Sequence, residues 1–254
     1  LLPVYDKPMI YYPLSILMLA NINDILIITT AEDSDRFIKL LGDGSQLGVS
    51  IQYEIQDKPT GIPDAFVVGE KFIGNERVCL ILGDNIFHAD TFINTHILPN
   101  INTSVPTVFG YYVKDPERYG VVEFDKSQKV LSIEEKPTNP KSDYAITGLY
   151  IFNNDVSKIA KNLKASKRGE TEIVDIMNHY LMQDNLKVEL LGRGVTWLDT
   201  GTHHSLHEAS TYIEVLESRQ GLKIASLEEI AFEKGFISKD QLLSQAKTLK
   251  GTNY

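Results

Sequence analysis

The sequence predicts an α/β protein in which helices flank a mainly parallel, mixed sheet, with an antiparallel insertion and a C-terminal helical section. Three observations support this fold class. Strand-like and helix-like segments alternate with short links over residues 1–105. Between Thr107 and Phe152 the strand-like segments follow one another with few helices between them. From Ser205 onward the pattern is helical and contains no proline.

The first part predicts βαβ units. Its strands are rich in β-branched residues and its helices carry apolar residues at helical spacing. Because strands and helices alternate with short links, we expect a mainly parallel sheet with right-handed crossovers. Val78–Leu82 has five consecutive apolar residues, as expected for a strand buried on both faces of a parallel sheet. The predicted helices are Met9–Ala20, Glu32–Leu41 and Ile62–Phe72, and the other predicted strands are Asp24–Thr30 and Val49–Ile55.

The second part predicts mostly antiparallel strands, and the third part helices. We therefore divide the chain into a core, 1–203, with parts 1–105 and 106–203, and a C-terminal section, 204–254, suited to oligomer contacts. The predicted strands of the second part are Thr107–Val113, Gly120–Asp125, Lys129–Glu135, Tyr144–Phe152 and Leu186–Leu191, and its helices are Val156–Leu163 and Glu172–Met182.

Composition narrows the class of protein. The chain has 254 residues and a net charge of −9, which argues against non-specific nucleic-acid binding because that needs a basic face. It contains no run of eighteen apolar residues, so we expect no membrane span. Its single cysteine, Cys79, implies no disulfide framework and fits a reducing cytoplasm. The negative charge of an anionic small substrate would have to be neutralised by a few local cations or by a metal ion.

Two aspartates follow apolar segments. Asp84 comes directly after Val78–Leu82 and Gly83, and Asp199 follows Trp197 and Leu198. Ligands of open α/β sheets bind at the carboxyl ends of strands, and two carboxylates there can jointly hold Mg²⁺ while phosphate oxygens and water complete its coordination. The alternative for each aspartate is a helix or turn cap.

Three other segments carry candidate binding residues. Lys136 could bind a phosphate and Glu135 could accept hydrogen bonds from sugar hydroxyls. The alternative is that both are solvent-exposed residues on a sheet edge. Arg168 could reach an anion near the following helix, although a solvated loop is the simpler interpretation. Gln56 could contact a base through its amide and Gly61 lets the backbone approach a flat ligand, unless this segment is a plain turn. Neither G-x-G-x-x-G nor the P-loop motif occurs.

Taken together, these segments resemble the bacterial glucose-1-phosphate thymidylyltransferases over essentially the whole chain. The motifs that carry the resemblance are Leu2–Ser15 (LPVYDKPMIYYPLS), Leu82–Asn85 (LGDN), Glu117–Val122 (ERYGVV), Glu134–Pro137 (EEKP), Thr147–Tyr150 (TGLY), Arg168–Glu170 (RGE) and Trp197–Thr202 (WLDTGT). The resemblance implies a Rossmann-like core and transfer of a nucleotidyl group from dTTP to glucose-1-phosphate. It also implies a cytoplasmic homotetramer that makes dTDP-glucose for dTDP-rhamnose and polysaccharide precursors.

The resemblance also implies roles by position. It makes Asp84 and Asp199 the Mg²⁺ ligands, and Lys136 the residue that binds the sugar phosphate, with Arg168 nearby. The other implied contacts are glucose at Glu135, Gly120 and Ile146, thymine at Gln56 and Gly61, and the nucleotide sugar at Asn85.

Two departures from the family pattern matter. The family's N-terminal strand and glycine-rich triphosphate loop do not occur in the printed sequence, so we expect this chain as printed to turn over poorly. After Gly61 the sequence is Ile62-Pro63-Asp64-Ala65 where the family has L-A-Q-A. The alternatives are therefore a UTP-using sugar-1-phosphate uridylyltransferase and a noncatalytic sugar-nucleotide-binding homologue. A GT-A glycosyltransferase is a weaker one, because Asp84 is followed by Asn85-Ile86 rather than by an acid-x-acid pair.

Overall fold

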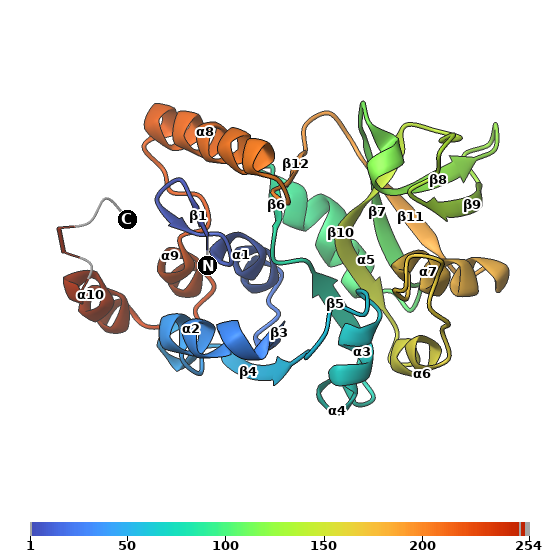
Figure 1. Ribbon diagram of the computed structural model, residues 1–254. Coiled ribbons are helices and arrows are strands. Elements are labelled where there is room, and N and C mark those ends of the chain that lie inside the picture. The colour runs from blue at the N-terminus through green and yellow to red at the C-terminus, as the bar shows by residue number, and fades with distance from the viewer. Residues whose placement is uncertain (1, 249, 252–254) are drawn as a thin grey trace.

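The computed structural model describes residues 2–248 and 250–251. Its largest sheet has six strands in the order β11-β7-β10-β8-β9, with β5 also paired to β10 (Figure 1). The strands of this sheet are β5 (Val78–Ile81), β7 (Thr107–Tyr112), β8 (Gly120–Phe124), β9 (Val130–Glu135), β10 (Tyr144–Phe152) and β11 (Lys187–Leu191).

Strand β10 is the central strand of this sheet and is irregular in its middle. Its first half pairs with β7 and, at Ala145, with β8, whereas its second half pairs with β7 and β5. The register with β7 shifts between Ile146 and Tyr150. This irregularity allows one strand to belong to the curled β8–β9 hairpin at one end and to the interior of the protein at the other.

A second, parallel pair of strands, β3 (Asp24–Thr29) and β4 (Ser50–Ile55), lies on the other side of the molecule (Figure 1). A third, antiparallel pair links distant parts of the sequence: β6 (Asn85–His88) pairs with β12 (Thr196–Asp199), and Asp199 lies opposite Asn85. A small hairpin of β1 (Pro3–Val4) and β2 (Lys7–Pro8) contacts the long helix α8. The β6–β12 pair therefore brings the two predicted aspartate segments together.

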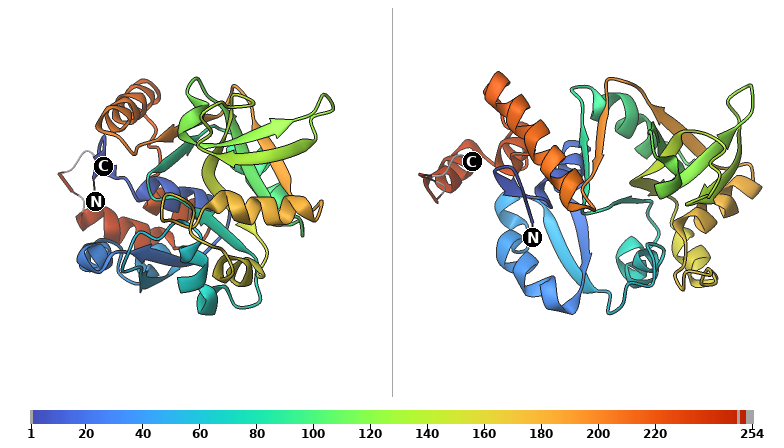
Figure 2. Two further views of the ribbon diagram at one scale, coloured as in Figure 1. Left: turned by 45° about the vertical axis from the view of Figure 1, so that its right-hand side comes forward. Right: turned by 45° about the horizontal axis from the view of Figure 1, so that its top comes forward.

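Helices cover both sides of this framework (Figure 2). Helices α1, α2 and α9 enclose the β3–β4 pair in one apolar cluster, whereas α3, α6 and α7 pack with β8–β10 in another. The helices are α1 (Tyr11–Leu19), α2 (Ala31–Leu41), α3 (Asp64–Val68), α4 (Glu70–Ile73), α5 (Leu98–Ile101), α6 (Val156–Lys161), α7 (Ile173–Met182), α8 (His203–Gln220), α9 (Leu227–Glu233) and α10 (Lys239–Thr248). Within the described residues no helix is long and apolar enough to cross a membrane.

The predicted α/β class, a mixed sheet flanked by helices, is confirmed. The prediction that this sheet is mainly parallel needs correction, because only β3–β4 and β11–β7 pair in parallel among the described strands. Strand β5 runs antiparallel to β10 and is only partly buried. Alternation along the sequence indicates which elements exist, but the residues of β10 that pair with β5 lie 68 to 74 positions away and cannot be derived from local pattern.

The helix predicted at Ile62–Phe72 is divided. It begins at Asp64 and is interrupted at Gly69, which ends α3 and precedes α4. Glycine weakens a helix interior by about 1 kcal/mol relative to alanine, and here it falls where the two short helices meet. The predicted domain boundaries near residues 105 and 203 remain a prediction.

Candidate active site

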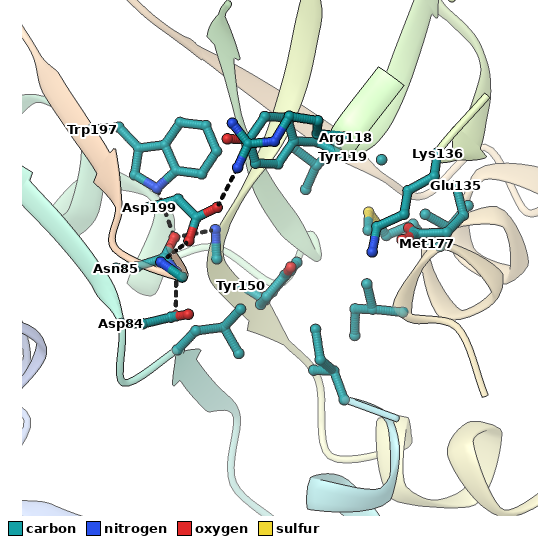
Figure 3. Close-up of a pocket in the computed structure, with 18 of the residues that line it drawn as sticks. Asp84, Asn85, Arg118, Tyr119, Glu135, Lys136, Tyr150, Met177, Trp197 and Asp199 are labelled. Atoms are coloured by element: carbon teal, nitrogen blue, oxygen red, sulfur yellow. Dashed lines mark hydrogen bonds and ion pairs between the residues drawn. The ribbon is translucent and has the colours of Figure 1, made fainter. Parts of the chain in front are cut away.

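A cavity of about 520 Å³ opens between two walls of the sheet framework. One wall comes from β6, β12 and the turns beside them, and the other from β8, β9 and α7 (Figure 3). Tyr150 of β10 lies between the walls. Asp84 and Asp199 are on the first wall, and Glu135 and Lys136 are on the second.

Asp84 occupies the turn between β5 and β6, where the buried neighbour Asn85 orients it. The Asn85 Oδ1 accepts hydrogen bonds from Trp197 Nε1 at 2.6 Å and from the Gly148 backbone N at 3.0 Å. Both partners can only donate, so the amide Nδ2 must face Asp84, and it donates to Asp84 Oδ1 at 2.8 Å. This arrangement fixes one carboxylate oxygen and leaves Oδ2 directed elsewhere.

The irregularity in β10 makes room for Asn85. A Cβ on Gly148 would lie 2.6 Å from Asn85 Oδ1, a separation that no side chain could accept without displacing the amide. Glycine is therefore required by close approach at this position. The TGLY and LGDN motifs are therefore in contact, because Asn85 occupies the space that Gly148 leaves free.

Asp199 is held by the local backbone. Its Oδ1 accepts a hydrogen bond from the Gly201 N at 3.0 Å. The N-cap of α8 is Thr202, which forms a reciprocal capping box with Ser205, so Asp199 is not the helix cap. Its bond from the Gly201 N does cap the local turn, as the alternative interpretation expected, and its Oδ2 takes no part in that bond. Its Oδ2 lies 3.9 Å from Arg118 Nη2, while Arg118 also pairs with Asp115 at 2.8 Å.

The two carboxylates share one small concavity. A Cβ built on Gly201 would lie 3.1 Å from Asp199 Oδ1 and 3.7 Å from Asp84 Oδ2. Burial raises the pKa of Asp84, and the negative charge of Asp199 raises it further against the hydrogen bond from Asn85. Like-charge pairs with perturbed pKa values cluster at functional sites, and a cation bound between two carboxylates would offset their repulsion. Within the described residues no cluster of three or more His, Cys, Asp or Glu side chains could hold a metal, so water or substrate oxygens would have to complete the coordination.

Lys136 is directed into the cavity by an unusual backbone. It follows the last residue of β9 with φ of 43°, in the left-handed region that non-glycine residues rarely adopt, and its N donates to the Tyr119 O at 2.9 Å. The side chain points towards the cavity from the wall opposite the aspartates (Figure 3). Strained conformations of this kind cluster at functional sites, which supports the predicted role of Lys136.

Glu135 belongs to the same wall, and Arg168 lies beside it outside the cavity. Burial raises the pKa of Glu135, as does the charge of Glu172, while Lys136 and Arg168 oppose that shift. Arg168 is exposed and lies 3.4 Å from Glu135, 3.5 Å from Glu172 and 3.9 Å from Glu170. Arg168 does not line the cavity, so its predicted contact with the sugar phosphate would require the side chain to leave these carboxylates.

The predicted residues other than Arg168 line two adjoining cavities. The second, of about 400 Å³, shares the lining residues Ile62 and Leu82 with the first. Gln56 and Gly61 line this second cavity. The predicted residues that line the first cavity are Asp84, Asn85, Gly120, Glu135, Lys136, Ile146 and Asp199.

Several lining residues were not predicted. Tyr119 and Trp197 lie beside Asp199, and burial with the Asp199 charge raises the pKa of Tyr119 to about 12. Both residues lie in motifs that carry the family resemblance, ERYGVV and WLDTGT. Their position next to predicted site residues in the sequence could have identified them. Met177 comes from α7, whose apolar pattern predicts only a packed helix face, and no local signal distinguishes it.

The geometry defines a class of site: paired carboxylates face a lysine across a pocket at a sheet edge, an arrangement suited to phosphorylated ligands. A family model described as nucleotidyl transferase matches residues 1–215, and the chain belongs to this family. Similar curated proteins include the glucose-1-phosphate thymidylyltransferases of Neisseria gonorrhoeae, 56% identical, and Mycolicibacterium smegmatis, 50% identical, each over 100% of this chain and 88% of the relative.

Solved structures agree with this assignment. A Bacillus anthracis protein assigned as a glucose-1-phosphate thymidylyltransferase, in complex with a sucrose, is 42% identical with a TM-score of 0.75, covering 84% of this chain and 85% of that one. A UDP-glucose pyrophosphorylase complexed with UDP-glucose is 22% identical with a TM-score of 0.71, covering 83% of this chain and 88% of that one, and it supports the fold alone. The family resemblance inferred from the sequence motifs is therefore confirmed.

Proposed function

We propose that the protein transfers a thymidylyl group from dTTP to glucose-1-phosphate, giving dTDP-glucose and pyrophosphate, with Mg²⁺ as cofactor. The observation that carries the proposal is the placement of Asp84 and Asp199 opposite Lys136 across one cavity. The names of the relatives support the choice of substrates.

The proposed reaction needs positioning and charge neutralisation rather than a protein nucleophile. An oxygen of the sugar phosphate attacks the α-phosphorus in line, and because that oxygen is ionised at neutral pH no general base is required. Lys136 neutralises the sugar phosphate, and Glu135 accepts hydrogen bonds from sugar hydroxyls. Asp84 and Asp199 would hold Mg²⁺, which supplies charge stabilisation at the reacting phosphates.

The two halves of the proposed site come from the two predicted parts of the core. Gln56, Gly61 and Asp84 belong to residues 1–105, which we assign to the nucleotide. Lys136 and Glu135 belong to residues 106–203, which we assign to the sugar phosphate. We infer further that section 204–254 supports a homotetramer, that the enzyme works in the cytoplasm, and that its product feeds dTDP-rhamnose and polysaccharide synthesis. Light scattering on the purified protein tests the tetramer.

The experiment is a substrate panel on the full-length protein. Glucose-1-phosphate is combined with dTTP, UTP, dCTP, ATP or GTP, with Mg²⁺ or with EDTA, and pyrophosphate release and the sugar nucleotide are measured. We expect turnover with dTTP that EDTA abolishes. Turnover with UTP but not dTTP would replace the proposal with a uridylyltransferase, and nucleotide binding without turnover would indicate a noncatalytic homologue.

Lys136→Gln provides the matched test of the sugar-phosphate assignment. Losing the charge should raise KM for glucose-1-phosphate at least about tenfold, since charge-assisted contacts to phosphate are among the strong ones. Lys129→Gln is the control, because Lys129 is an exposed lysine in the β8–β9 hairpin that pairs with Asp184 and lies outside the cavity. Equal effects of the two substitutions would mean that general positive charge, not Lys136, attracts the substrate.

A further inference from the structure

The loop that carries Gln56 contains a directed chain of hydrogen bonds. Gln56 Nε2 donates to Thr60 Oγ1 at 3.4 Å and to the Gly61 O at 3.4 Å, and Thr60 Oγ1 donates to Asp64 Oδ2 at 2.8 Å. This series of hydrogen bonds thus ends at Asp64, the carboxylate found where the family sequence has glutamine.

The direction of this chain follows from which atoms can donate. The Asp64 carboxylate, 2.8 Å from Thr60 Oγ1, and the Lys58 O, 3.5 Å from it, both only accept. The single proton of the Thr60 hydroxyl therefore goes to the nearer Asp64, and the hydroxyl can only accept from Gln56. The Gly61 carbonyl also only accepts. Both neighbours therefore require the amide nitrogen of Gln56, and no other orientation of the amide satisfies them.

The loop itself is held in place. The Thr60 O accepts hydrogen bonds from the Thr171 N at 2.9 Å and from the Thr171 Oγ1 at 3.1 Å. Gly61 has φ of 118°, and a Cβ there would lie 2.1 Å from the Thr171 O, so the two segments meet too closely for any other residue. At its other end the Gln56 N donates to the Thr29 O at the end of β3, at 2.9 Å.

One consequence concerns the opposite end of the amide. Gln56 lines the second cavity, and among the described residues no protein group donates to its Oε1. The atom available to a ligand is thus an acceptor. A pyrimidine with a ring N–H, such as thymine or uracil, can donate to it, whereas cytosine presents a ring nitrogen acceptor and would leave two acceptors facing each other.

We propose that Asp64 is a positioning residue that acts through Thr60 and, together with the Gly61 carbonyl, fixes the Gln56 amide with its oxygen towards the cavity, and thereby selects imide-type pyrimidines over cytosine. This inference rests on the proposed function, because it takes the second cavity as the base site. Asp64 itself touches no base in this proposal. It sets the direction of the hydrogen bonds between Thr60 and Gln56.

The test compares dTTP with dCTP in two measurements on the full-length protein. Kd is measured by calorimetry without sugar phosphate, so that no turnover occurs, and kcat and KM are measured with it. Asp64→Asn keeps the shape but can donate to Thr60, and Thr60→Val removes the hydroxyl. We expect each to lower the preference for dTTP over dCTP about tenfold in Kd and KM with kcat nearly unchanged, a modest effect because the two Gln56 contacts are long.

Two controls separate hydrogen-bond direction from charge and packing. Thr60→Ser keeps the hydroxyl and should keep the preference, and Asp57→Asn removes a carboxylate from the same loop outside the chain of hydrogen bonds. The inference is overturned if both Asp64→Asn and Thr60→Val keep the wild-type preference, or if either control loses it equally. Failure of the proposed function is a different result, namely a wild-type protein that binds neither nucleotide or that makes no sugar nucleotide from dTTP.

Discussion

The molecule contains two clusters of charged side chains that differ in how completely their charges are paired. The cavity cluster is formed by Asp84, Asp199 and Arg118. The core cluster, between the β1–β2 hairpin and α8, is formed by Asp6, Lys7, Glu217 and Lys223. In the core cluster two cations meet two anions. In the cavity cluster the exposed Arg118 lies 3.9 Å from Asp199 and also pairs with Asp115, and among the described residues no cation pairs with Asp84.

The pKa directions report the same difference. For Asp6, burial alone would raise the pKa, but hydrogen bonds and charges from Lys223 and Lys7 outweigh it and lower the pKa. For Asp84, burial and the Asp199 charge leave the pKa raised. We therefore interpret buried charges that are fully paired as stabilising the fold. Buried charges that lack enough opposite charge, such as Asp84, indicate a site where a ligand supplies that charge.

Lys7 is the most buried member of the core cluster. Its side chain is fully enclosed, pairs with Asp6 and lies 2.8 Å from Glu217, with its ammonium 5.7 Å from the Tyr12 ring centroid. Lys223 pairs with Asp6 and lies 3.1 Å from Glu217 Oε2. The cluster thus ties the hairpin that opens the chain to the end of α8.

The comparison predicts the largest effect at the cavity cluster, on activity. Asp84→Asn should lower turnover by at least about a hundredfold, since a cation contributes several kcal/mol of charge stabilisation in such reactions. The midpoint of thermal unfolding should stay unchanged or rise, because the change removes one of two like charges. Steady-state rates and calorimetric scans measure both quantities, and full activity in this variant would end the two-carboxylate assignment.

At the core cluster the comparison predicts the reverse outcome for Lys7→Met. Removing one partner of a buried ion pair leaves uncompensated charge, so the free energy of unfolding should fall by about 3–5 kcal/mol. Rates per folded molecule at low temperature should change little. Urea unfolding measures this loss, with Asp24→Asn as an exposed control. A change below about 1 kcal/mol would show that the core cluster does not stabilise the fold.

A smaller effect is expected for Lys223→Met, because this side chain is 31% exposed. Solvent screening reduces the expected loss to about 1 kcal/mol at neutral pH. The Asp6 pKa is lowered in the folded state, so its stabilisation is present above its unfolded value of 3.8 and is lost as the pH falls through the folded value. Without Lys223 the Asp6 pKa rises, and acid unfolding should begin at a higher pH. An unshifted acid limb of the stability curve would contradict this coupling.

Much of the fold and of the site could be predicted from sequence. Strand β10 was predicted with its observed bounds, Tyr144–Phe152, because β-branched and aromatic residues dominate it and turn residues flank it. The α2 helix was predicted within one residue of Ala31–Leu41, because its stop at Gly42 is a local signal. Asp84, Asp199 and Lys136 were singled out because each directly follows a strand-like segment, and sheet edges gather such residues.

Tertiary structure alone decided how these residues act together. Antiparallel pairing of β5 with β10, the irregularity at Gly148 and the orientation of Asn85 all depend on contacts between segments 60 to 115 residues apart, about which local pattern carries no information. The same is true of the core cluster, since Lys7 meets Glu217 across 210 positions. The sequence determined which side chains could carry charge at strand ends, because propensity and periodicity are local. The fold decided which of those charges are paired and which remain open to a ligand, because pairing depends on distance in space.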